Sequence, residues 1–209
     1  MSTETHEQRR EAQRDLARRA ILDATEALLL DDGFDGFSIR RLVERCGYAA
    51  PSIYHYFGDK DGVLDALIEE RFAKLTAQLK RVPHSEDPVA NIRGLALAFV
   101  RFSLKHPTYF RLLFTPRAGD ETPPPSGEQA RDLVEGALVA LWESGRLRAS
   151  NPQTAGQALS VLCQGLVWSR IARPDHDWSK TLTEESIDAL LRGFVAPGDT
   201  ATRSAGEKS

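Results

Sequence analysis

The sequence predicts an all-α fold of about nine helices. Apolar residues recur three and four positions apart along most of the 209-residue chain, which places them on one face of each helix. We find no internal repeat and no pattern typical of a β-strand. The segment from Ser38 to Lys60 has the composition of two short helices around a tight turn, followed by the start of a third.

The composition suits one large domain or two small ones, because 41% of the residues are hydrophobic and can form a sizeable core. The formal net charge of -3 does not indicate nucleic-acid binding, so any DNA-binding patch must be local. Two groups of basic residues offer such a patch: Arg9, Arg10, Arg14, Arg18 and Arg19, and then Arg40, Arg41, Arg45 and Lys60. Each group also fits a solvated helix face.

The two cysteines, Cys46 and Cys163, lie far apart without metal-ligand spacing, and we interpret both as small buried hydrophobic residues. The lack of a disulfide framework suits a reducing compartment. No apolar run is long enough to span a membrane, and the polar N-terminal segment does not resemble a signal peptide. We therefore expect a cytoplasmic protein with no membrane partner.

The first short helix of the central segment is expected after Ser38, whose hydroxyl can accept a hydrogen bond from an amide of the first turn. Ile39, Leu42 and Val43 recur at helical spacing and form its buried face. Gly47 can adopt the left-handed conformation that a sharp turn needs.

The second short helix is expected to begin around Pro51, whose missing N–H costs nothing in the first turn. Ile53 and Phe57 are four residues apart, and we assign both to the core. The remaining face carries Ser52, Tyr54, His55 and Tyr56. A short polar and aromatic face of this kind is what a helix-turn-helix inserts into the DNA major groove.

On these residues the segment CGYAAPSIYHYFGDKDGVL resembles the signature of the TetR family of bacterial transcriptional repressors. The matching positions are Gly47, Ile53, Tyr54, Phe57, Lys60 and Leu64. The resemblance covers about residues 14–67. It departs at Ala49, where the family usually has a capping Ser or Thr, so the helix either starts one residue later, after Ala50, or starts more weakly.

The resemblance implies an N-terminal three-helix DNA-binding unit and a larger C-terminal unit for ligand binding and dimerisation. We assign residues 9–58 to the first, 59–196 to the second, and 197–209 to a disordered tail. The run His106–Phe114 also resembles a segment of the WHG-type subgroup of the family. The Trp-x-x-x-His-Gly motif of that subgroup is not matched, because Ser160 and Gln164 stand at its Trp and His positions.

The apolar spacing predicts helices over about residues 10–32, 39–46, 51–57, 60–81, 88–105, 106–114, 128–144, 152–172 and 183–194. Residues 1–8 are expected to be disordered, and the proline-rich stretch 115–127 to be a loop. Three boundaries have a local signal: Gly33 ends the first helix, while Asp59 and Thr183 cap the fourth and ninth. The apolar stripe of the first helix is expected to include Leu16, Ala20, Ile21, Ala24, Leu28, Leu29 and Leu30.

The candidate DNA-binding residues are Ser38, Arg40, Ala50, Pro51, Ser52, Tyr54, His55 and Lys60. Tyr54 also fits a core position, whereas the family resemblance implies that it reaches a phosphate. His55 is more exposed by pattern. Because the second short helix has no Arg, Asn or Gln, strong bidentate recognition of bases is not available from it.

The resemblance also implies a ligand cavity among helices four to eight. The candidate ligand-binding residues are Phe99, Phe102, Phe110, Phe114, Trp142, Gln164 and Trp168. Each of these aromatic residues also fits an ordinary core position, and Trp142 is expected to face inward from the seventh helix. Arg101, Arg111 and His106 are further candidate polar partners for a ligand.

We therefore predict a DNA-binding transcriptional regulator, a repressor that a small-molecule ligand releases from a palindromic operator. The resemblance and the broad apolar surfaces of helices eight and nine predict a homodimer through these helices. The first alternative is a ligand-independent DNA-organising protein on the same scaffold. The second, a small helical enzyme, is a poor interpretation because we find no nucleophile–base set, no HExxH and no Gly-rich phosphate loop. No cofactor or metal ion is expected.

Overall fold

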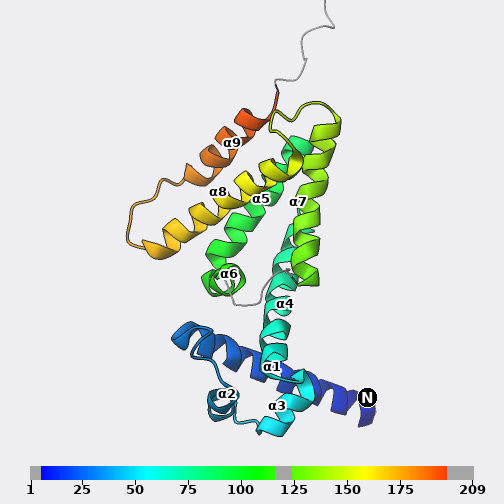
Figure 1. Ribbon diagram of the computed structural model, residues 1–209, viewed down its shortest axis with the longest axis vertical. Coiled ribbons are helices and arrows are strands. Elements are labelled where there is room, and N and C mark those ends of the chain that lie inside the picture. The colour runs from blue at the N-terminus through cyan, green and yellow to red at the C-terminus, as the bar shows by residue number, and fades with distance from the viewer. Residues whose placement is uncertain (1–5, 116–123, 197–209) are drawn as a thin grey trace, which may run out of the picture. The chain divides into compact units, whose positions relative to one another are not determined.

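The computed structural model describes residues 6–115 and 124–196, which form nine α-helices (Figure 1). Within these residues the only β-type pairing is an isolated bridge between Leu147 and Val195, so the predicted all-α class is confirmed. The helices are α1 (His6–Asp32), α2 (Ile39–Cys46), α3 (Ala50–Phe57), α4 (Lys60–Leu79), α5 (Pro88–Lys105), α6 (Pro107–Phe114), α7 (Pro125–Glu143), α8 (Pro152–Ala172) and α9 (Leu182–Phe194).

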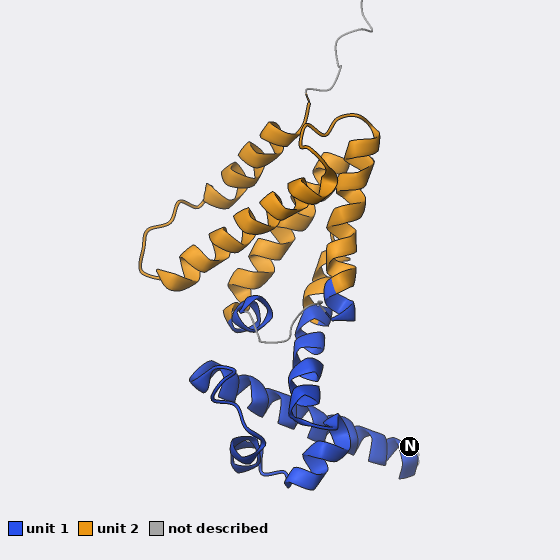
Figure 2. Cartoon of the chain, viewed as in Figure 1, with its two compact units in different colours: residues 1–73, 108–127 blue, residues 74–107, 128–209 orange. Residues whose placement is uncertain are grey.

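Two compact units divide the chain (Figure 2). Unit 1 consists of Met1–Ala73 and Thr108–Gly127, and unit 2 of Lys74–Pro107 and Glu128–Ser209. The division therefore falls inside α4, which is covalently continuous between the units. The functional division between residues 58 and 59 remains a prediction.

The core of unit 1 joins α1, α2, α3, the first half of α4 and Leu112 of α6. Its fully buried members include Ile21, Leu22, Leu42, Ile53 and Leu67. The apolar stripe of α1 is displaced from the predicted one. Leu16 and Leu30 are 66% and 40% exposed, and Ala20 is exposed, whereas Ala17, Leu22 and Thr25 are buried instead. The predicted inward positions of Leu16, Ala20 and Leu30 are wrong because other helices cover only one side of α1.

Several helix boundaries also differ from the prediction. Residues 6–8 belong to α1, and Pro125, Ser126 and Gly127 belong to α7, where a proline is tolerated in the first turn. Helix α4 ends at Leu79 rather than near residue 81, and α9 begins at Leu182. Thr183 is therefore not the cap; its hydroxyl accepts a hydrogen bond from Arg170 Nη2 at 2.9 Å. The predicted loop at 116–123 and the tail at 197–209 lie outside the described residues.

In unit 2, α5 packs against α8 and α9, which also contact each other. Arg93 of α5 donates to both carboxylate oxygens of Asp188 on α9, at 2.6 and 3.1 Å. That hydrogen bond is the main cause of the lowered pKa of Asp188. Trp142 is 45% exposed, so its predicted inward position is wrong. No helix among the described residues is long and apolar enough to cross a membrane.

Candidate nucleic-acid interface

Helix α2 is fixed at both ends by the residues that the sequence indicated. Ser38 Oγ accepts a hydrogen bond from the Arg41 amide at 3.4 Å, which caps the N-terminus. Gly47 has φ of 74°, and its amide donates to the Val43 carbonyl at 3.0 Å. Leu42 is fully buried, so α2 is held against the core of unit 1 and the chain turns sharply into α3.

Helix α3 begins at Ala50, directly after Ala49, which takes the N-cap position without a side-chain hydrogen bond. The helix start has therefore not shifted by one residue; it lacks a cap. The Ala49 carbonyl accepts hydrogen bonds from the amides of Ser52 and Ile53, at 2.9 and 3.2 Å. Pro51 lies in the first turn as predicted.

The faces of α3 separate a buried anchor from an exposed surface. Ile53 is fully buried, whereas Tyr54 is 46% exposed and His55 is exposed. Tyr54 is therefore not a core residue in this unit. Tyr56 and Phe57 are both half-buried against the core cluster, so Phe57 is less buried than predicted and Tyr56 belongs to the inner face rather than the outer one.

The joint between α3 and α4 is tight. Asp59 Oδ1 accepts a hydrogen bond from the Gly62 amide at 2.7 Å and caps α4, as predicted. A Cβ atom at Gly62 would lie 2.0 Å from the Phe57 carbonyl oxygen, so only glycine fits this approach. Lys60 is exposed in the first turn of α4, with Nζ 5.8 Å from the centroid of the Phe37 ring.

The arginines of α2 divide into two groups. Arg41 pairs with Asp32 at 2.7 Å and Arg45 pairs with Asp31 at 2.7 Å, so both hold α2 to the end of α1. The side chain of Arg40 is 85% exposed, and its Nε lies 3.8 Å from the Glu44 carboxylate of the same helix. Of the three, Arg40 is the cation that α2 offers to an external partner.

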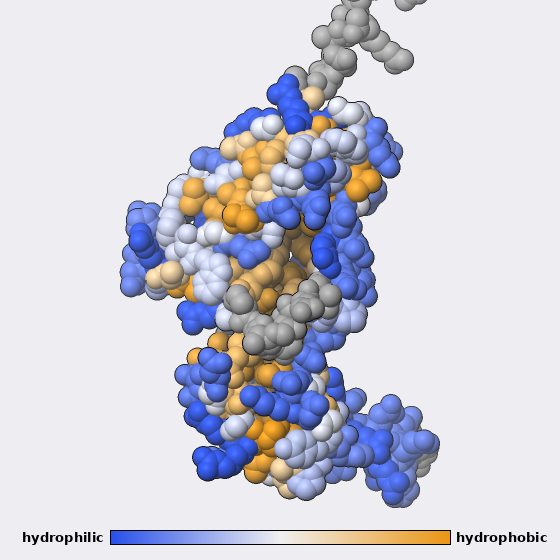
Figure 3. Space-filling model, in the orientation of Figure 1, coloured by the Kyte–Doolittle hydropathy of each residue, from blue (hydrophilic) through white to orange (hydrophobic). Residues whose placement is uncertain are grey.

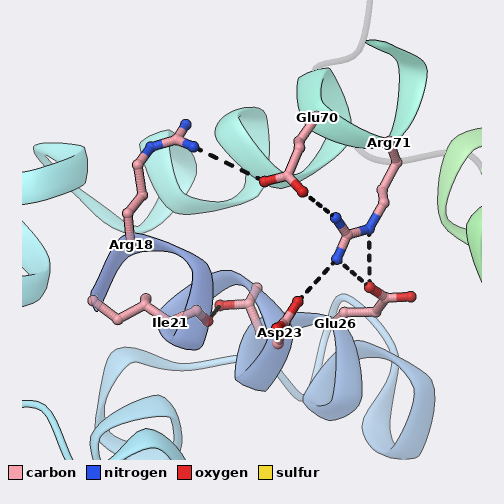
Figure 4. Close-up of polar contacts among 7 residues, drawn as sticks. Arg18, Ile21, Asp23, Glu26, Glu70 and Arg71 are labelled. Atoms are coloured by element: carbon pink, nitrogen blue, oxygen red, sulfur yellow. Dashed lines mark hydrogen bonds and ion pairs between the residues drawn. The ribbon is translucent and has the colours of Figure 1, made fainter. Parts of the chain in front are cut away.

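An ion cluster around the buried Arg71 holds α1 against α4 (Figure 4). Arg71 of α4 is only 1% exposed, and its guanidinium binds Glu26 and Asp23 of α1. It also donates to Glu70 at 2.6 Å, and Glu70 lies 3.9 Å from Arg18 of α1. The Tyr109 ring of α6 lies 4.8 Å from the guanidinium carbon.

Two opposing effects act on the pKa of Arg71. Burial disfavours its charged form, but the hydrogen bond with Glu26 and the charges of Glu26 and Glu70 outweigh burial and raise the pKa above the usual value. Arg71 therefore stays charged and joins α1, α4 and α6 of unit 1. Arg71 is not among the functional or core residues predicted from the sequence. A signal was present, because Arg71 lies three residues after Ile68 and four before Leu75, on the apolar stripe of α4.

All of the predicted DNA-binding residues lie on α2, α3, their caps or the first turn of α4. Arg40, Pro51, Tyr54, His55 and Lys60 are exposed, whereas the remaining members, Ser38, Ala50 and Ser52, are half-buried. Tyr54 and His55 are exposed on α3, whereas Ile53 of the same helix is buried in the core. The surface formed by Arg40, Ser52, Tyr54, His55 and Lys60 is called the recognition surface below.

The predicted ligand-binding residues are divided between the two units. Phe110 and Phe114 belong to unit 1, with ring centroids 5.0 Å apart, and Phe114 also contacts Phe72. The others belong to unit 2: Phe99, Phe102, Trp142, Gln164 and Trp168. Trp168 is 37% exposed, and Gln164 donates to Ser160 Oγ at 2.8 Å.

Unit 2 also contains a half-open groove of about 550 Å³ between the end of α4, the start of α5 and α7. Leu79, Leu95 and Ala137 are among its apolar lining, with His84 and Asp132 among its polar lining. None of the seven predicted ligand-binding residues lines it. In the described part of the chain, no three His, Cys, Asp or Glu residues are grouped so as to hold a metal ion.

Comparison with known proteins identifies both halves of the chain. The family model described as bacterial regulatory proteins of the tetR family matches residues 21–67. A second model, described as tetracyclin repressor-like, C-terminal domain, matches residues 92–194. Together the two matches include the helix-turn-helix and most of unit 2. The narrower likeness to the WHG-type subgroup stays a prediction.

Among curated proteins, the HTH-type transcriptional regulator BetI of Burkholderia ambifaria is 30% identical over 87 residues, which is 41% of this chain and 45% of BetI. The match therefore spans less than half the length of that relative. Among solved structures, a TetR family transcription regulator from Marinobacter aquaeolei has a TM-score of 0.75 at 18% identity, over 90% of this chain and all of that one.

The SmeT–triclosan complex has a TM-score of 0.65 at 21% identity, over 92% of this chain and all of SmeT. SmeT is described as the repressor of the Stenotrophomonas maltophilia multidrug efflux pump SmeDEF. At these identities the structural likenesses establish the fold, and they extend it over both units.

Proposed function

We propose that this chain, which belongs to the TetR family of bacterial regulatory proteins, is a DNA-binding transcriptional regulator that represses from a palindromic operator. The observation that carries the proposal is the recognition surface. A buried Ile53 anchors α3, while Tyr54 and His55 face outward from it at the end of a tight helix-turn-helix. Such a regulator works where the chromosome is, so the cytoplasm is its proposed location.

The residues of the recognition surface have different proposed roles. Lys60 and Arg40 neutralise phosphates, because both are exposed cations beside α3. Ser52 and His55 contact base edges, and Ala50 or Pro51 contacts a thymine methyl group. Ser38 holds the first turn of α2 in place. Tyr54, which is 46% exposed, contacts a phosphate with its hydroxyl.

Selection of bound duplexes from a random pool tests the proposal directly. A single palindromic sequence with half-sites about 34–36 Å apart, or a multiple of that distance, is the expected product. With that site, Lys60→Ala should lower the slope of log affinity against log salt by about one unit, because one phosphate contact is lost. Ser52→Ala should change the selected sequence. A pool that yields no enriched sequence rejects the proposal.

A homodimer through α8 and α9 is part of the proposal, since a palindrome requires a two-fold partner. Support comes from an exposed apolar strip on α8. Val161 is 72% exposed and Trp168 37%, seven residues apart and hence on one side of the helix, with Gly165 exposed between them. Val161→Arg should give a monomer by analytical ultracentrifugation. It is a cleaner test than Leu190→Arg or Phe194→Arg, because Leu190 and Phe194 are half-buried within the protomer.

A small-molecule effector is the third part of the proposal. The structural neighbour SmeT was solved with triclosan, and the groove of unit 2 has a volume within the usual range of ligand pockets. An effector found by screening for release of DNA should lose its effect in Ala137→Trp, which fills the groove, while operator affinity and dimer mass remain. Unchanged release would show that the effector binds outside the groove.

The alternative function is a ligand-independent DNA-organising protein on the same scaffold. It predicts weak sequence preference and no compound that releases DNA. The two functions share the recognition surface and differ in what unit 2 does. The selection and the release screen therefore separate them.

A further inference from the structure

The first three turns of α1 form a helical arm that contributes nothing to the core. Every residue from His6 to Leu16 is exposed, and the first buried residue of the helix is Ala17. The arm also precedes residue 21, where the match to the family model begins. Figure 3 shows the start of α1 as a hydrophilic lobe that extends beyond the rest of unit 1. The folding of the unit therefore does not explain the composition of this arm.

Arginines follow one side of the arm at helical spacing. Arg10, Arg14 and Arg18 are four residues apart, so they share one side of α1. The last arginine of the row contacts α3: the guanidinium carbon of Arg18 lies 5.6 Å from the centroid of the Phe57 ring at the end of that helix. The arginine row therefore continues outward from the helix that carries the recognition surface.

The arm itself contains three arginines and three carboxylates, so its formal charge is balanced. Arg18 and Arg19, directly after the arm, give residues 6–19 a surplus of two positive charges in a chain with net charge -3. Arg18 forms an ion pair with Glu70, with 3.9 Å between Nη1 and Oε2. Arg10 and Arg14 are exposed, and they form no ion pair with any residue of the described ranges. These two cations are therefore available to an anionic partner next to α3.

We infer that the arm is a second DNA-binding surface, in which Arg10 and Arg14 neutralise backbone phosphates in the duplex that flanks the half-site bound by α3. The inference rests on the proposed function and lengthens the stretch of duplex that each protomer contacts. Eleven helical residues rise about 16 Å, which corresponds to about five base pairs at 3.4 Å each. Phosphates are the partner that an arginine row continuous with a DNA-reading helix fits.

The test compares wild type and two double variants on two duplexes. Arg10→Gln/Arg14→Gln removes both charges and keeps good helix formers in the arm. The matched control is Arg81→Gln/Arg131→Gln, which removes two exposed arginines from unit 2. One duplex carries the selected operator with ten flanking base pairs on each side, and the other ends at the half-sites. Circular dichroism checks that the helix content is unchanged.

With the long duplex, the slope of log affinity against log salt should be smaller for the arm variant than for wild type by about two units per protomer. The control variant should have the same slope as wild type. Trimming the flanks should weaken wild-type binding several-fold and leave the arm variant unaffected. A fall in slope without dependence on the flanks would overturn the inference, since it would reflect net charge alone. Equal behaviour of wild type and arm variant on both duplexes would also overturn it, and would point to an acidic protein partner. Failure to select any operator would instead reject the proposed function together with the arm.

Discussion

Arg71 of α4 directs both Nε and Nη2 at one carboxylate oxygen of Glu26 on α1, with Nε 2.9 Å from Oε2. The two residues are 45 positions apart in the sequence, and the Arg71 side chain is 1% exposed. Buried charges remain in folded proteins when they are paired and hydrogen-bonded. This pair therefore fixes the distance between α1, which carries the arm, and α4, which follows directly from the recognition surface.

Replacing Arg71 with Met should lower the free energy of unfolding by roughly 3–5 kcal/mol, because Glu26 would remain buried without its counter-charge. The double variant Arg71→Met/Glu26→Leu should recover most of this loss, since an apolar pair needs no charge partner. Urea unfolding of the two variants and of wild type measures both values. A double variant as unstable as the single one would show that the unpaired Glu26 charge is not the main cause of the lost stability.

Gly62→Ala should destabilise unit 1 by about 1–3 kcal/mol, because its Cβ would overlap the Phe57 carbonyl oxygen and push α3 and α4 apart. Operator affinity should fall as well. The matched control is Gly136→Ala on α7, where a Cβ meets no atom within 4 Å. That change should raise stability by roughly 0.5–1 kcal/mol, since alanine is the better helix former. Thermal unfolding measures both changes in stability, and two changes of the same sign would contradict the prediction.

Ala49→Ser should stabilise the protein by about 0.5–1 kcal/mol, because the new hydroxyl can accept a hydrogen bond from the Ser52 amide at the uncapped start of α3. Ser38→Ala is the reciprocal change at the capped start of α2, and it should cost a similar amount. Differential scanning calorimetry compares the two. If Ala49→Ser shows no gain while Ser38→Ala shows a loss, the α3 start is stabilised by other means.

Asp188→Asn should make stability less dependent on pH. The pKa of Asp188 is lowered, chiefly by the hydrogen bond from Arg93, so its folded value lies below its unfolded value. The carboxylate therefore stabilises the fold fully above the unfolded pKa of about 3.9, and this contribution disappears as pH falls through the folded pKa. The free energy of unfolding of wild type should exceed that of the variant by up to about 1 kcal/mol at pH 7.

The excess should begin to decline as the pH falls below about 4, the unfolded pKa, and disappear as the pH falls through the lower folded pKa. Asp177→Asn, which removes an exposed carboxylate from the loop before α9, is the control for net charge. Melting temperatures of the three proteins between pH 3 and 7 provide the measurement. A gap between wild type and Asp188→Asn that stays constant with pH would contradict the assigned cause.

The local part of the recognition surface was predictable from the sequence. The Ser38 cap, the left-handed Gly47 and the Asp59 cap each depend on a few neighbouring residues, and each is present as expected. The exposed position of His55 also follows from helical spacing around Ile53. Conformational preference and hydrogen bonding within one turn are encoded in the residues themselves, so they can be inferred without the fold.

The features that were not predicted depend on which other helix covers a given side chain. Leu16 and Trp142 are residue types that are common in protein cores, yet both are exposed. Arg71 is a residue type that is common on surfaces, yet it is buried. Thr183 was expected to cap α9 and instead binds Arg170. Spacing along one helix identifies an apolar side, but it does not say how far a neighbouring helix extends along that side.

By itself, the sequence determined the number and type of the helices, the helix-turn-helix and its caps, because these are settled by periodicity and by contacts within a few residues. Only the tertiary structure decided which arginines hold the fold and which remain for a partner. Arg41, Arg45 and Arg71 meet carboxylates of α1 that are distant from them in sequence, whereas Arg10, Arg14 and Arg40 stay exposed. An ion pair forms where two chain segments meet, and that meeting is a property of the packed core rather than of either segment.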